Sequence, residues 1–357
     1  MERFGFVGLP NAGKSSLYNA LTGGAALAAP YAFATKEPNV GVCKVPDHRL
    51  DALAALSKSK NVVNATVQVV DIGGLVEGAS KGEGLGNKFL GGIREVDAIT
   101  FVLRAFEDDD VPGPSDPLEH LRILELELSL ADLESVENQI EKRRKAAKGD
   151  KNLLEEVAAL DAANETLSNG VPIYRSTMDA KQRSLLRPYF LLTNKPVLAV
   201  VNVAEDALDT IDAQVARVQA ELGTAEIVGM CVQLEAEAAQ LEGADRAEML
   251  EALGLGEGAL PRLVRAAYHL LGLRTFLTTG EKESRAWTFH AGAKAPECAG
   301  VIHTDLQRGF IRAEVIHWDE LLEIGSWSKA KDVGKLRIEG KEYEVVDGDV
   351  LEIRFNV

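Results

Sequence analysis

The sequence predicts an α/β fold with a mostly parallel sheet, a long helical hairpin inserted in it, and a small β-rich domain after it. Three observations carry this prediction. Apolar runs of strand length alternate with helical patterns over roughly the first 260 residues. A cluster of helix breakers, PGPSDP, interrupts the alternation and precedes a long helical pattern. After about residue 270 the chain changes to short strand-like runs between glycines. Strands alternating with helices are typical of a parallel sheet covered on both faces.

Five apolar segments have the length and composition of buried strands. They are Arg3–Gly8, Val67–Asp71, Ala98–Arg104, Pro196–Asn202 and Glu226–Cys231. Helical stretches separate several of them, as parallel neighbours in a sheet require. We therefore expect the five strands to share one sheet.

The hairpin is predicted to begin at Asp116, which has the features of a helix N-cap. Pro117 stands at the first helical position and Glu119 three residues after the cap. An apolar stripe with spacings of mostly three and four residues follows. Its members are Leu118, Leu121, Leu124, Leu128, Leu133, Val136 and Ile140.

Two helices joined by a short turn should form an antiparallel pair resembling a coiled coil. The first helix is expected to end near Lys148–Gly149, which makes it roughly 45 Å long at 1.5 Å per residue. The second is expected from about Asn152 to Leu167, with Asn169–Gly170 ending it.

The predicted hairpin tip is strongly basic in a chain whose formal net charge is −16. Its cations are Lys142, Arg143, Arg144, Lys145, Lys148 and Lys151. One interpretation is a solvated helix end, where cations favour the helix dipole. The other is a contact with RNA or the ribosome. A strongly acidic protein should not coat nucleic acid, so any RNA contact must come from a local basic patch, and no DNA specificity is expected.

The last segment, of roughly 85 residues, has the pattern of a separate small domain. RAWTF, AGVIHTD, GFIRAEVI and KLRIEGKEYEVVDGDVLEIRFNV are predicted to contain short strands. Gly340 and Gly348 are expected at hairpin turns.

The overall composition predicts a cytoplasmic protein. No apolar run approaches the ~18–20 residues that a membrane span needs, and the first residues lack a secretory signal. The three cysteines, Cys43, Cys231 and Cys298, are widely separated and form no CxxC pair, so neither a disulfide framework nor a zinc site is indicated.

GLPNAGKS, from Gly8 to Ser15, matches the phosphate-binding loop pattern GxxxxGK[ST]. It follows a predicted strand and precedes a helix, which is the setting that the motif requires. Backbone N–H groups of such a loop surround a β-phosphate, and the helix N-terminus adds its positive end. Lys14 is predicted to reach the β- and γ-phosphates and the Ser15 hydroxyl to bind Mg²⁺. The fold class is therefore a P-loop NTPase.

DIGG ends the next predicted strand and indicates a second phosphate-side motif. Asp71 should face the crevice at the carboxyl end of the sheet and hold Mg²⁺ through a bound water. The Gly74 N–H is expected to sense the γ-phosphate. Thr35 lies between the two motifs and could add a second hydroxyl ligand to Mg²⁺. The glycine-rich segment GASKGEGLGNKF, which comes after DIGG in the sequence, suits a switch segment.

NVAE, from Asn202 to Glu205, stands where GTPases of this class carry Asn-Lys-x-Asp. The Asp of that motif accepts hydrogen bonds from N1–H and the 2-amino group of guanine. Glu205 is one methylene longer, and Val203 replaces the lysine. Asn202 can meet N7 and the 6-amino group of adenine. This substitution pattern favours ATP over GTP.

In combination these motifs resemble the YchF family of Obg-like ATPases over nearly the whole chain, with a C-terminal segment similar to a β-grasp-like TGS domain. The resemblance implies ATP hydrolysis with Mg²⁺ and association with ribosomes, the large subunit included. The boundaries it suggests are a nucleotide-binding segment at 1–112, an inserted hairpin at 113–190, a second nucleotide-binding segment at 191–272 and a TGS domain at 273–357.

Residue by residue, the resemblance implies a phosphate site, a metal site and a base site. The phosphate ligands are Asn11, Ala12, Gly13, Lys14, Ser15 and Ser16. Ser15 and Thr35 would bind Mg²⁺. The adenine would meet Asn202, Val203 and Glu205, with Phe106 flanking it. Cys231 and Val232 lie where related proteins carry Ser-Ala, so a thiol weakens any bond made by the hydroxyl there while backbone contacts survive.

Two departures predict slow hydrolysis. Leu75 follows DIGG where Ras-like GTPases place the Gln that orients water, and residues 107–117 carry no His although the family has one in that segment. The nearest, His120, is interpreted as a solvated helix residue. A ribosomal partner or a monovalent cation such as K⁺ would then complete the site. The alternatives are a small-molecule kinase, a nucleotide-dependent scaffold with little turnover, and an Obg-type GTPase.

Overall fold

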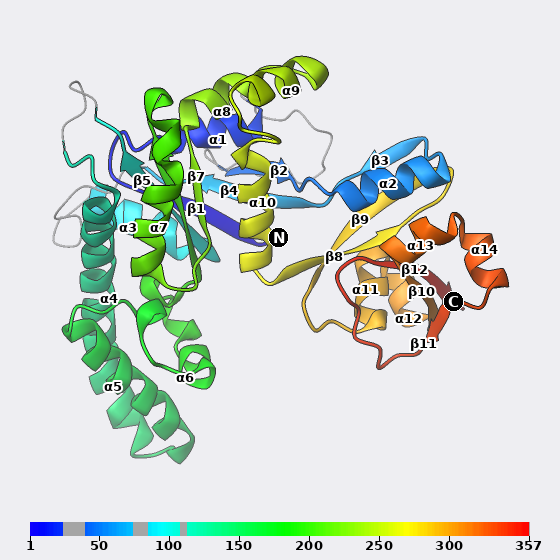
Figure 1. Cartoon of the computed structure of the whole chain (residues 1–357). Helices are drawn as coiled ribbons and strands as arrows, with labels where there is room; N and C mark the ends of the chain where they lie inside the picture. The colour runs from blue at the N-terminus through cyan, green and yellow to red at the C-terminus, as the bar shows by residue number, and fades with distance from the viewer. Residues whose placement is uncertain (24–39, 74–84, 108–112, 357) are drawn as a thin grey trace. The chain divides into compact units, whose positions relative to one another are not determined.

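The computed structural model describes residues 1–23, 40–73, 85–107 and 113–356, and Figure 1 shows the whole chain. The chain forms two compact units. The first contains Met1–Val42 and Gln68–Ala267, and the second contains Cys43–Val67 and Tyr268–Val357. No helix among the described residues is long and apolar enough to cross a membrane.

A six-stranded sheet in the order β2-β4-β1-β5-β6-β7 forms the centre of the first unit. Its strands are β1 (Arg3–Val7), β2 (Val40–Lys44), β4 (Thr66–Asp71), β5 (Ala98–Ala105), β6 (Val197–Val203) and β7 (Ile227–Met230). The pairings β4-β1, β1-β5, β5-β6 and β6-β7 are all parallel. The five predicted strands are confirmed to within two residues, and β2 was not predicted.

Helices cover this sheet, and the inner strand β6 is correspondingly buried along its whole length. The helices of this layer are α1 (Lys14–Thr22), α3 (Leu85–Arg94), α7 (Ile211–Leu222), α8 (Val232–Ala238), α9 (Gly243–Ala252) and α10 (Ala259–Leu270). Every residue of β6 is buried. A strand that buries both faces cannot show the polar alternation of a half-exposed strand.

The predicted hairpin is present as α4 (Pro117–Ala147), a 3₁₀ turn (Lys151–Leu153) and α5 (Leu154–Ser168). The Asp116 side chain accepts a hydrogen bond from the Leu118 N–H, which confirms the predicted N-cap. The first half of α4 packs on the sheet through Leu121, Leu124 and Leu128. The second half packs on α5, so this part of the hairpin extends away from the sheet with a small core of its own (Figure 1).

A buried carboxylate joins α4 to the segment that leads into β6. Asp132 has no exposed surface, and its oxygens accept hydrogen bonds from the Leu192 N–H at 2.8 Å and from the Thr193 N–H and hydroxyl at 2.7 Å each. Burial raises the pKa of Asp132 to about 6, against the opposing effect of these three donors. The 3₁₀ turn Leu192–Asn194 is thereby attached to the middle of the long helix.

The second unit is built on another six-stranded sheet, in the order β11-β10-β12-β8-β9-β3. Its strands are β3 (Asn61–Val63), β8 (Leu273–Thr278), β9 (Glu283–His290), β10 (Phe310–His317), β11 (Arg337–Glu339) and β12 (Asp349–Phe355). Its helices are α2 (His48–Ser57), α11 (Ala295–Ile302), α12 (Thr304–Arg308), α13 (Trp318–Ile324) and α14 (Trp327–Asp332). Phe276, Phe289, Val315 and Leu351 lie in its core.

Two predictions for this unit were wrong. The strand expected at 299–305 is helical, because Ala295, Cys298 and Ala299 place their buried side chains at the spacing of a helix face. Gly340 and Gly348 do not make hairpin turns. They follow β11 and precede β12, and β10 lies between those two strands and pairs with both.

Residues 43–67 leave the first unit after β2, form α2 and β3 in the second unit, and return through β4. The Lys60 N–H donates to the Glu281 carbonyl at 3.0 Å, and β3 runs parallel to β9. The Arg49 guanidinium pairs with Asp347 at 2.7 Å. The sequence gives no signal for this excursion, and the domain boundaries stated above stay a prediction.

Candidate functional site

The loop between β1 and α1 has the strand-loop-helix setting that the sequence predicted. Asn11 and Gly13 both take positive φ, at 59° and 101°. A Cβ added at Gly13 would lie 2.6 Å from Asn202 Nδ2, so glycine is required there for space as well as for conformation. The backbone from Gly8 to Gly13 thus curls tightly ahead of the first turn of α1.

Lys14 is buried inside this loop, with 6% of its side chain surface exposed. Its ammonium donates to the Gly8 carbonyl at 3.0 Å and the Leu9 carbonyl at 2.7 Å. Burial lowers the pKa of Lys14 to about 8, partly opposed by the charge of Asp71. Phosphate oxygens can replace the two carbonyls as acceptors, and their negative charge makes the stronger bond.

Ser15 and Asp71 lie together beside that lysine. The Ser15 hydroxyl donates to Asp71 Oδ2 at 2.8 Å. The other oxygen, Asp71 Oδ1, is buried and has no partner among the described residues. A buried carboxylate oxygen without a donor is costly, and hard oxygen ligands suit Mg²⁺. These two residues therefore fit a hydrated Mg²⁺, whereas Thr35, Gly74 and Leu75 lie outside the described residues.

Asn202, at the carboxyl end of β6, links the P-loop to the start of α8. Its Nδ2 donates to the Ala12 carbonyl at 3.1 Å, and its Oδ1 accepts from the Val232 N–H at 3.0 Å. The side chain is 5% exposed. Asn202 therefore holds two backbone segments of the predicted site in place, and its contact with adenine stays a prediction.

The other predicted base-site residues differ in exposure. The Val203 side chain belongs to the apolar core, so any contact that it makes with a base must come from its backbone. Cys231 and Val232 are also buried, at 3% and 2% exposure. Glu205 is exposed, in the short 3₁₀ helix Glu205–Thr210 after β6.

Arg104 was not predicted, although it holds Phe106 in two ways. Its Nε–H donates to the Phe106 carbonyl at 2.8 Å, and its guanidinium carbon lies 4.9 Å from the centre of the Phe106 ring. Arg104 is 2% exposed and pairs in register with Asn202 of β6. The available signal was a single cation in the apolar run FVLRAF, which is unusual for a buried strand.

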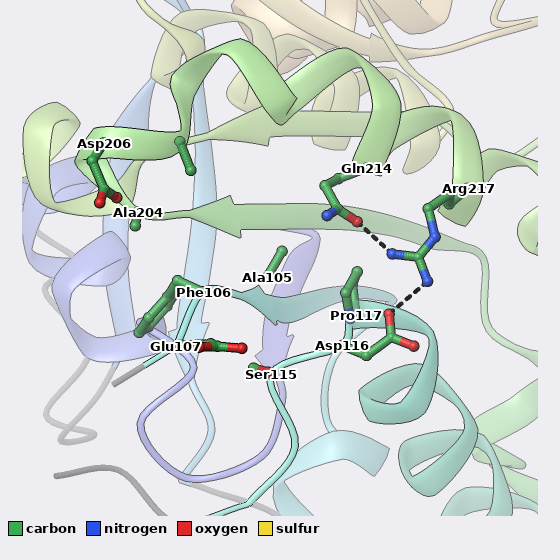
Figure 2. Close-up of a pocket in the computed structure, with 11 residues that line it drawn as sticks. Ala105, Phe106, Glu107, Ser115, Asp116, Pro117, Ala204, Asp206, Gln214 and Arg217 are labelled. Carbon is green, nitrogen blue, oxygen red and sulfur yellow. Dashed lines mark hydrogen bonds and ion pairs between the residues drawn. The ribbon is translucent and has the colours of Figure 1, made fainter. Parts of the chain in front are cut away.

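A cavity of about 410 Å³ opens beside Phe106 at the carboxyl ends of β5 and β6 (Figure 2). Arg217 of α7 closes one side, donating to Asp116 at 2.9 Å and to Gln214 at 2.8 Å. The lining residues are Ala105, Phe106, Glu107, Ser115, Asp116, Pro117, Ala204, Asp206, Ala207, Gln214 and Arg217. The loop predicted to read the base therefore borders open space.

The interpretation of His120 as a solvated residue was wrong, although its place inside the helix is confirmed. His120 is 2% exposed because the chain before α4 folds back over the ring, whose Nε2 lies 2.7 Å from the Pro114 carbonyl. Its Nδ1 is buried without a partner among the described residues. Burial lowers the pKa of His120, and the charges of Arg104 and Lys14 lower it further. The ring is therefore neutral near pH 7 and donates its Nε2–H to Pro114.

Comparisons with known proteins agree along the whole chain. A family model described as a 50S ribosome-binding GTPase matches residues 3–150, and a YchF C-terminal model, described as a protein of unknown function, matches residues 273–356. Proteins called ribosome-binding ATPase YchF from Bacillus subtilis and Haemophilus influenzae are each 47% identical, over 99% of both chains. The solved structure of the Schizosaccharomyces pombe YchF GTPase matches with a TM-score of 0.88 at 33% identity, over 99% of this chain and 97% of that one. The P-loop, the hairpin and the C-terminal unit are thus shared over the full length, and the chain belongs to the YchF family.

Proposed function

We propose that this protein is an ATP-hydrolysing P-loop switch that associates with ribosomes. The observation that carries the hydrolytic part is the arrangement of Lys14, Ser15 and Asp71, with one carboxylate oxygen of Asp71 left without a donor. The names of the full-length relatives support ATP as substrate and the ribosome as partner. Such a switch uses hydrolysis to change conformation, so it needs no second substrate pocket.

In this proposal the chain's own groups stabilise charge more than they activate water. Lys14 and the Gly74 N–H offset the γ-phosphate charge, and Ser15, Thr35 and water-bridged Asp71 hold Mg²⁺, whose role is to neutralise the phosphates. Among the described residues the carboxylate beside Lys14 is that of Asp71, and this proposal assigns it to Mg²⁺ and not to the attacking water. We therefore expect slow hydrolysis until a ribosomal partner or a monovalent cation such as K⁺ completes the site.

We extend the proposal to the remaining assignments, of which the first two rest on the resemblance of the sequence motifs. The C-terminal unit is proposed to be a TGS domain, and the protein to be Obg-like. The large ribosomal subunit is the proposed partner, since the model matched by residues 3–150 names the 50S particle. Ribosome association would place the protein in the cytoplasm.

Base choice needs its own argument, because the matched names divide between ATPase and GTPase. The Val203 side chain lies in the core, so nothing replaces the lysine that GTPases place at this position. Both amide atoms of Asn202 already bond to the backbone. Glu205 stands at the sequence position of the guanine-reading Asp. Its extra methylene moves the carboxylate away from the place that the Asp carboxylate takes in a GTPase.

The first prediction is that ATP binds more tightly than GTP. Unpaired polar groups of guanine cost roughly 1–3 kcal/mol each, so the GTP dissociation constant should be at least about 10-fold higher. Competition calorimetry measures the ratio. The variant Glu205→Asp, with the shorter side chain, should reduce the ratio of the GTP dissociation constant to that of ATP. A wild-type protein that binds GTP as tightly as ATP would instead be an Obg-type GTPase.

The cations of the hairpin tip form two groups, those that pair with a carboxylate and those that have no carboxylate partner among the described residues. Arg143 pairs with Glu156 at 3.3 Å, and Arg144 pairs with Asp161 at 2.8 Å and Glu141 at 3.1 Å. In the described part of the chain no carboxylate pairs with the four lysines of the tip. These are Lys142, Lys145, Lys148 and Lys151, and all four are exposed. They are the groups available to an RNA phosphate.

The second prediction therefore changes the four lysines and leaves the arginines in place. Changing all four to Glu should weaken ribosome association by at least 10-fold in cosedimentation, and the deficit should be larger at low salt than at high salt. Hydrolysis without ribosomes should stay unchanged. Changing the same four to Arg keeps the charge and should keep binding. Full binding by the Glu variant would restore the interpretation of a solvated helix end.

The third prediction concerns His120. His120→Ala should leave the single-turnover rate of ATP hydrolysis within about 3-fold, because the ring is held by the Pro114 carbonyl. It should lower the free energy of unfolding by roughly 1–3 kcal/mol, since the carbonyl loses its donor. His120→Gln, which keeps an N–H donor, should recover part of that loss. A large rate loss with intact ATP affinity would make His120 the water-positioning residue.

A further inference from the structure

Arg104 is a buried cation near the end of β5, and two of its contacts are made to Phe106. Its exposed fraction is 2%, its Nε–H donates to the Phe106 carbonyl, and its guanidinium carbon lies within cation–π range of the Phe106 ring. Burying a charged group costs free energy, and an apolar side chain would fill the same strand position without that cost. The arginine therefore indicates a function for the contacts that it makes.

The Phe106 ring faces a cavity and does not belong to the core of the sheet. Among the described residues, that core takes up Phe101 and Leu103 of the same strand but not Phe106. Phe106 is half-buried and is the one aromatic side chain among the described residues that line the cavity of about 410 Å³ (Figure 2). Core packing does not fix the direction of this ring, whereas the contact with Arg104 does.

The ring lies within reach of a nucleotide whose phosphates occupy the P-loop. β5 runs parallel to β1 on one side and to β6 on the other, so the three strands end at the same edge of the sheet. The P-loop follows β1, and Asn202 at the end of β6 donates to the Ala12 carbonyl of that loop. A base attached to the bound phosphates can therefore extend to the ends of β5 and β6, where Phe106 lies.

Arg104 and Asn202 form one cross-strand pair, and both side chains are buried. Asn202 holds the Ala12 carbonyl and the Val232 N–H, and Arg104 holds Phe106. A single pair of neighbouring residues thus fixes the P-loop, the start of α8 and the end of β5. Walls that are fixed before a ligand arrives lose less conformational entropy when it binds.

We propose that Arg104 is a positioning residue for the nucleotide base, which holds the Phe106 ring in the orientation on which a base stacks. This inference rests on the proposed ATP-binding function. Every base has a π-face, so stacking strengthens the binding of adenine and guanine alike. Arg104 therefore sets the affinity for a base in general, whereas Glu205 sets the choice between bases.

The test measures the binding of three ligands to the full-length protein without ribosomes. These are Mg²⁺–ATP, Mg²⁺–GTP and Mg²⁺–tripolyphosphate, which has the phosphates and no base. Phe106→Ala should weaken ATP binding by about 5- to 100-fold. Arg104→Met, a side chain of similar length without charge, should weaken ATP and GTP binding by the same factor of at least about 5.

A residue that acts through the base site should leave the phosphate site unchanged. In Arg104→Met, tripolyphosphate affinity and kcat at saturating ATP should each stay within about 3-fold, so that the loss appears in KM. Arg104→Lys keeps a cation and a donor, and it should bind ATP more tightly than Arg104→Met. In the Phe106→Ala background, Arg104→Met should cost no more than about 2-fold further, because the arginine acts through the ring.

Arg183 offers a matched control in the helix α6 (Ala180–Leu185) of the same unit, since it also donates to a backbone carbonyl, that of Asn194 at 3.0 Å. Arg183→Met should change ATP affinity by less than about 3-fold. Retained tripolyphosphate binding checks that each variant keeps a folded P-loop.

Three outcomes overturn the inference. The first is a loss of ATP affinity in Phe106→Ala but none in Arg104→Met, which leaves the base site in place. The second is an equal loss of ATP and tripolyphosphate in Arg104→Met, which makes the arginine structural. The third is unchanged ATP affinity in Phe106→Ala, which moves the base elsewhere. Failure of the proposed function itself is seen separately, as wild-type protein that does not bind ATP.

Discussion

Lys14→Ala will lose at least 100-fold in ATP affinity and a further 100-fold or more in single-turnover hydrolysis, while the protein stays folded. The ammonium is buried between the Gly8 and Leu9 carbonyls and is positioned to exchange them for phosphate oxygens. A charge-assisted bond to phosphate in such a site contributes roughly 2–4 kcal/mol to the bound and transition states. Titration with a fluorescent ATP analogue and quench-flow measurement of phosphate release give the two losses separately. Unchanged ATP affinity would remove the P-loop assignment.

The pKa of Lys14 predicts how ATP affinity should depend on pH. In the free protein the pKa of Lys14 is about 8, so the amine loses its proton as the pH rises above that value. A bound triphosphate favours the protonated form, and binding above pH 8 must therefore take up a proton. ATP affinity should fall about 5-fold between pH 8 and 9, with proton uptake visible as a buffer-dependent binding enthalpy. Lys14→Arg should bind ATP without that pH dependence.

Asp132→Ala will lower the free energy of unfolding of the nucleotide-binding unit by roughly 3–5 kcal/mol. The substitution removes the single acceptor of two backbone N–H groups and one hydroxyl, and all three stay buried between α4 and the Leu192–Asn194 turn. Chemical denaturation followed by far-UV circular dichroism gives the change. A loss below 1 kcal/mol would mean that this turn is held by packing alone.

Two control variants test whether the loss of stability comes from the hydrogen bonds of Asp132 or from any substitution in this part of α4. Asp132→Asn keeps one acceptor oxygen and should lose less than the alanine variant. Glu134→Ala lies two residues further along α4 on an exposed position and should change stability by no more than about 0.5 kcal/mol. A Glu134→Ala variant that loses as much stability as Asp132→Ala would mean that the loss is not specific to the hydrogen bonds of Asp132, because alanine itself favours the helix.

The parts of the fold that the sequence predicted are those specified by short-range patterns. The P-loop, the five central strands and the capped hairpin each follow from spacing and residue type within about 30 neighbouring residues. Ser15 and Asp71 were predicted to serve the same Mg²⁺. The structure brings them together because β1 and β4 are parallel neighbours that end at the same edge of the sheet.

The parts that were missed depend on contacts between distant segments. His120 has a helical position that suits solvent equally well, and only the fold-back at Pro114 buries it. A buried cation such as Arg104 is unexpected in an apolar strand, and its role becomes clear only from its hydrogen bond to the Phe106 carbonyl. The small apolar residues of α11 are compatible with a strand and with a helix, and it is their packing in the core of the second unit that selects the helix. The placement of β3, within the excursion of residues 43–67, depends on a partner strand 222 residues further along the chain.

That excursion sets an order of events during synthesis. Val63 pairs with Arg285, so β3 leaves the ribosome long before its partner exists. At elongation rates of about 5–20 residues per second, the wait is on the order of 10–40 s. During that interval Leu50 and Leu53 of α2, fully buried in the finished protein, have no core to enter. Nascent chains shorter than about 290 residues should therefore be the ones that chaperones retain and proteases cleave near α2, and a fragment ending at Ala267 should inherit the same weakness.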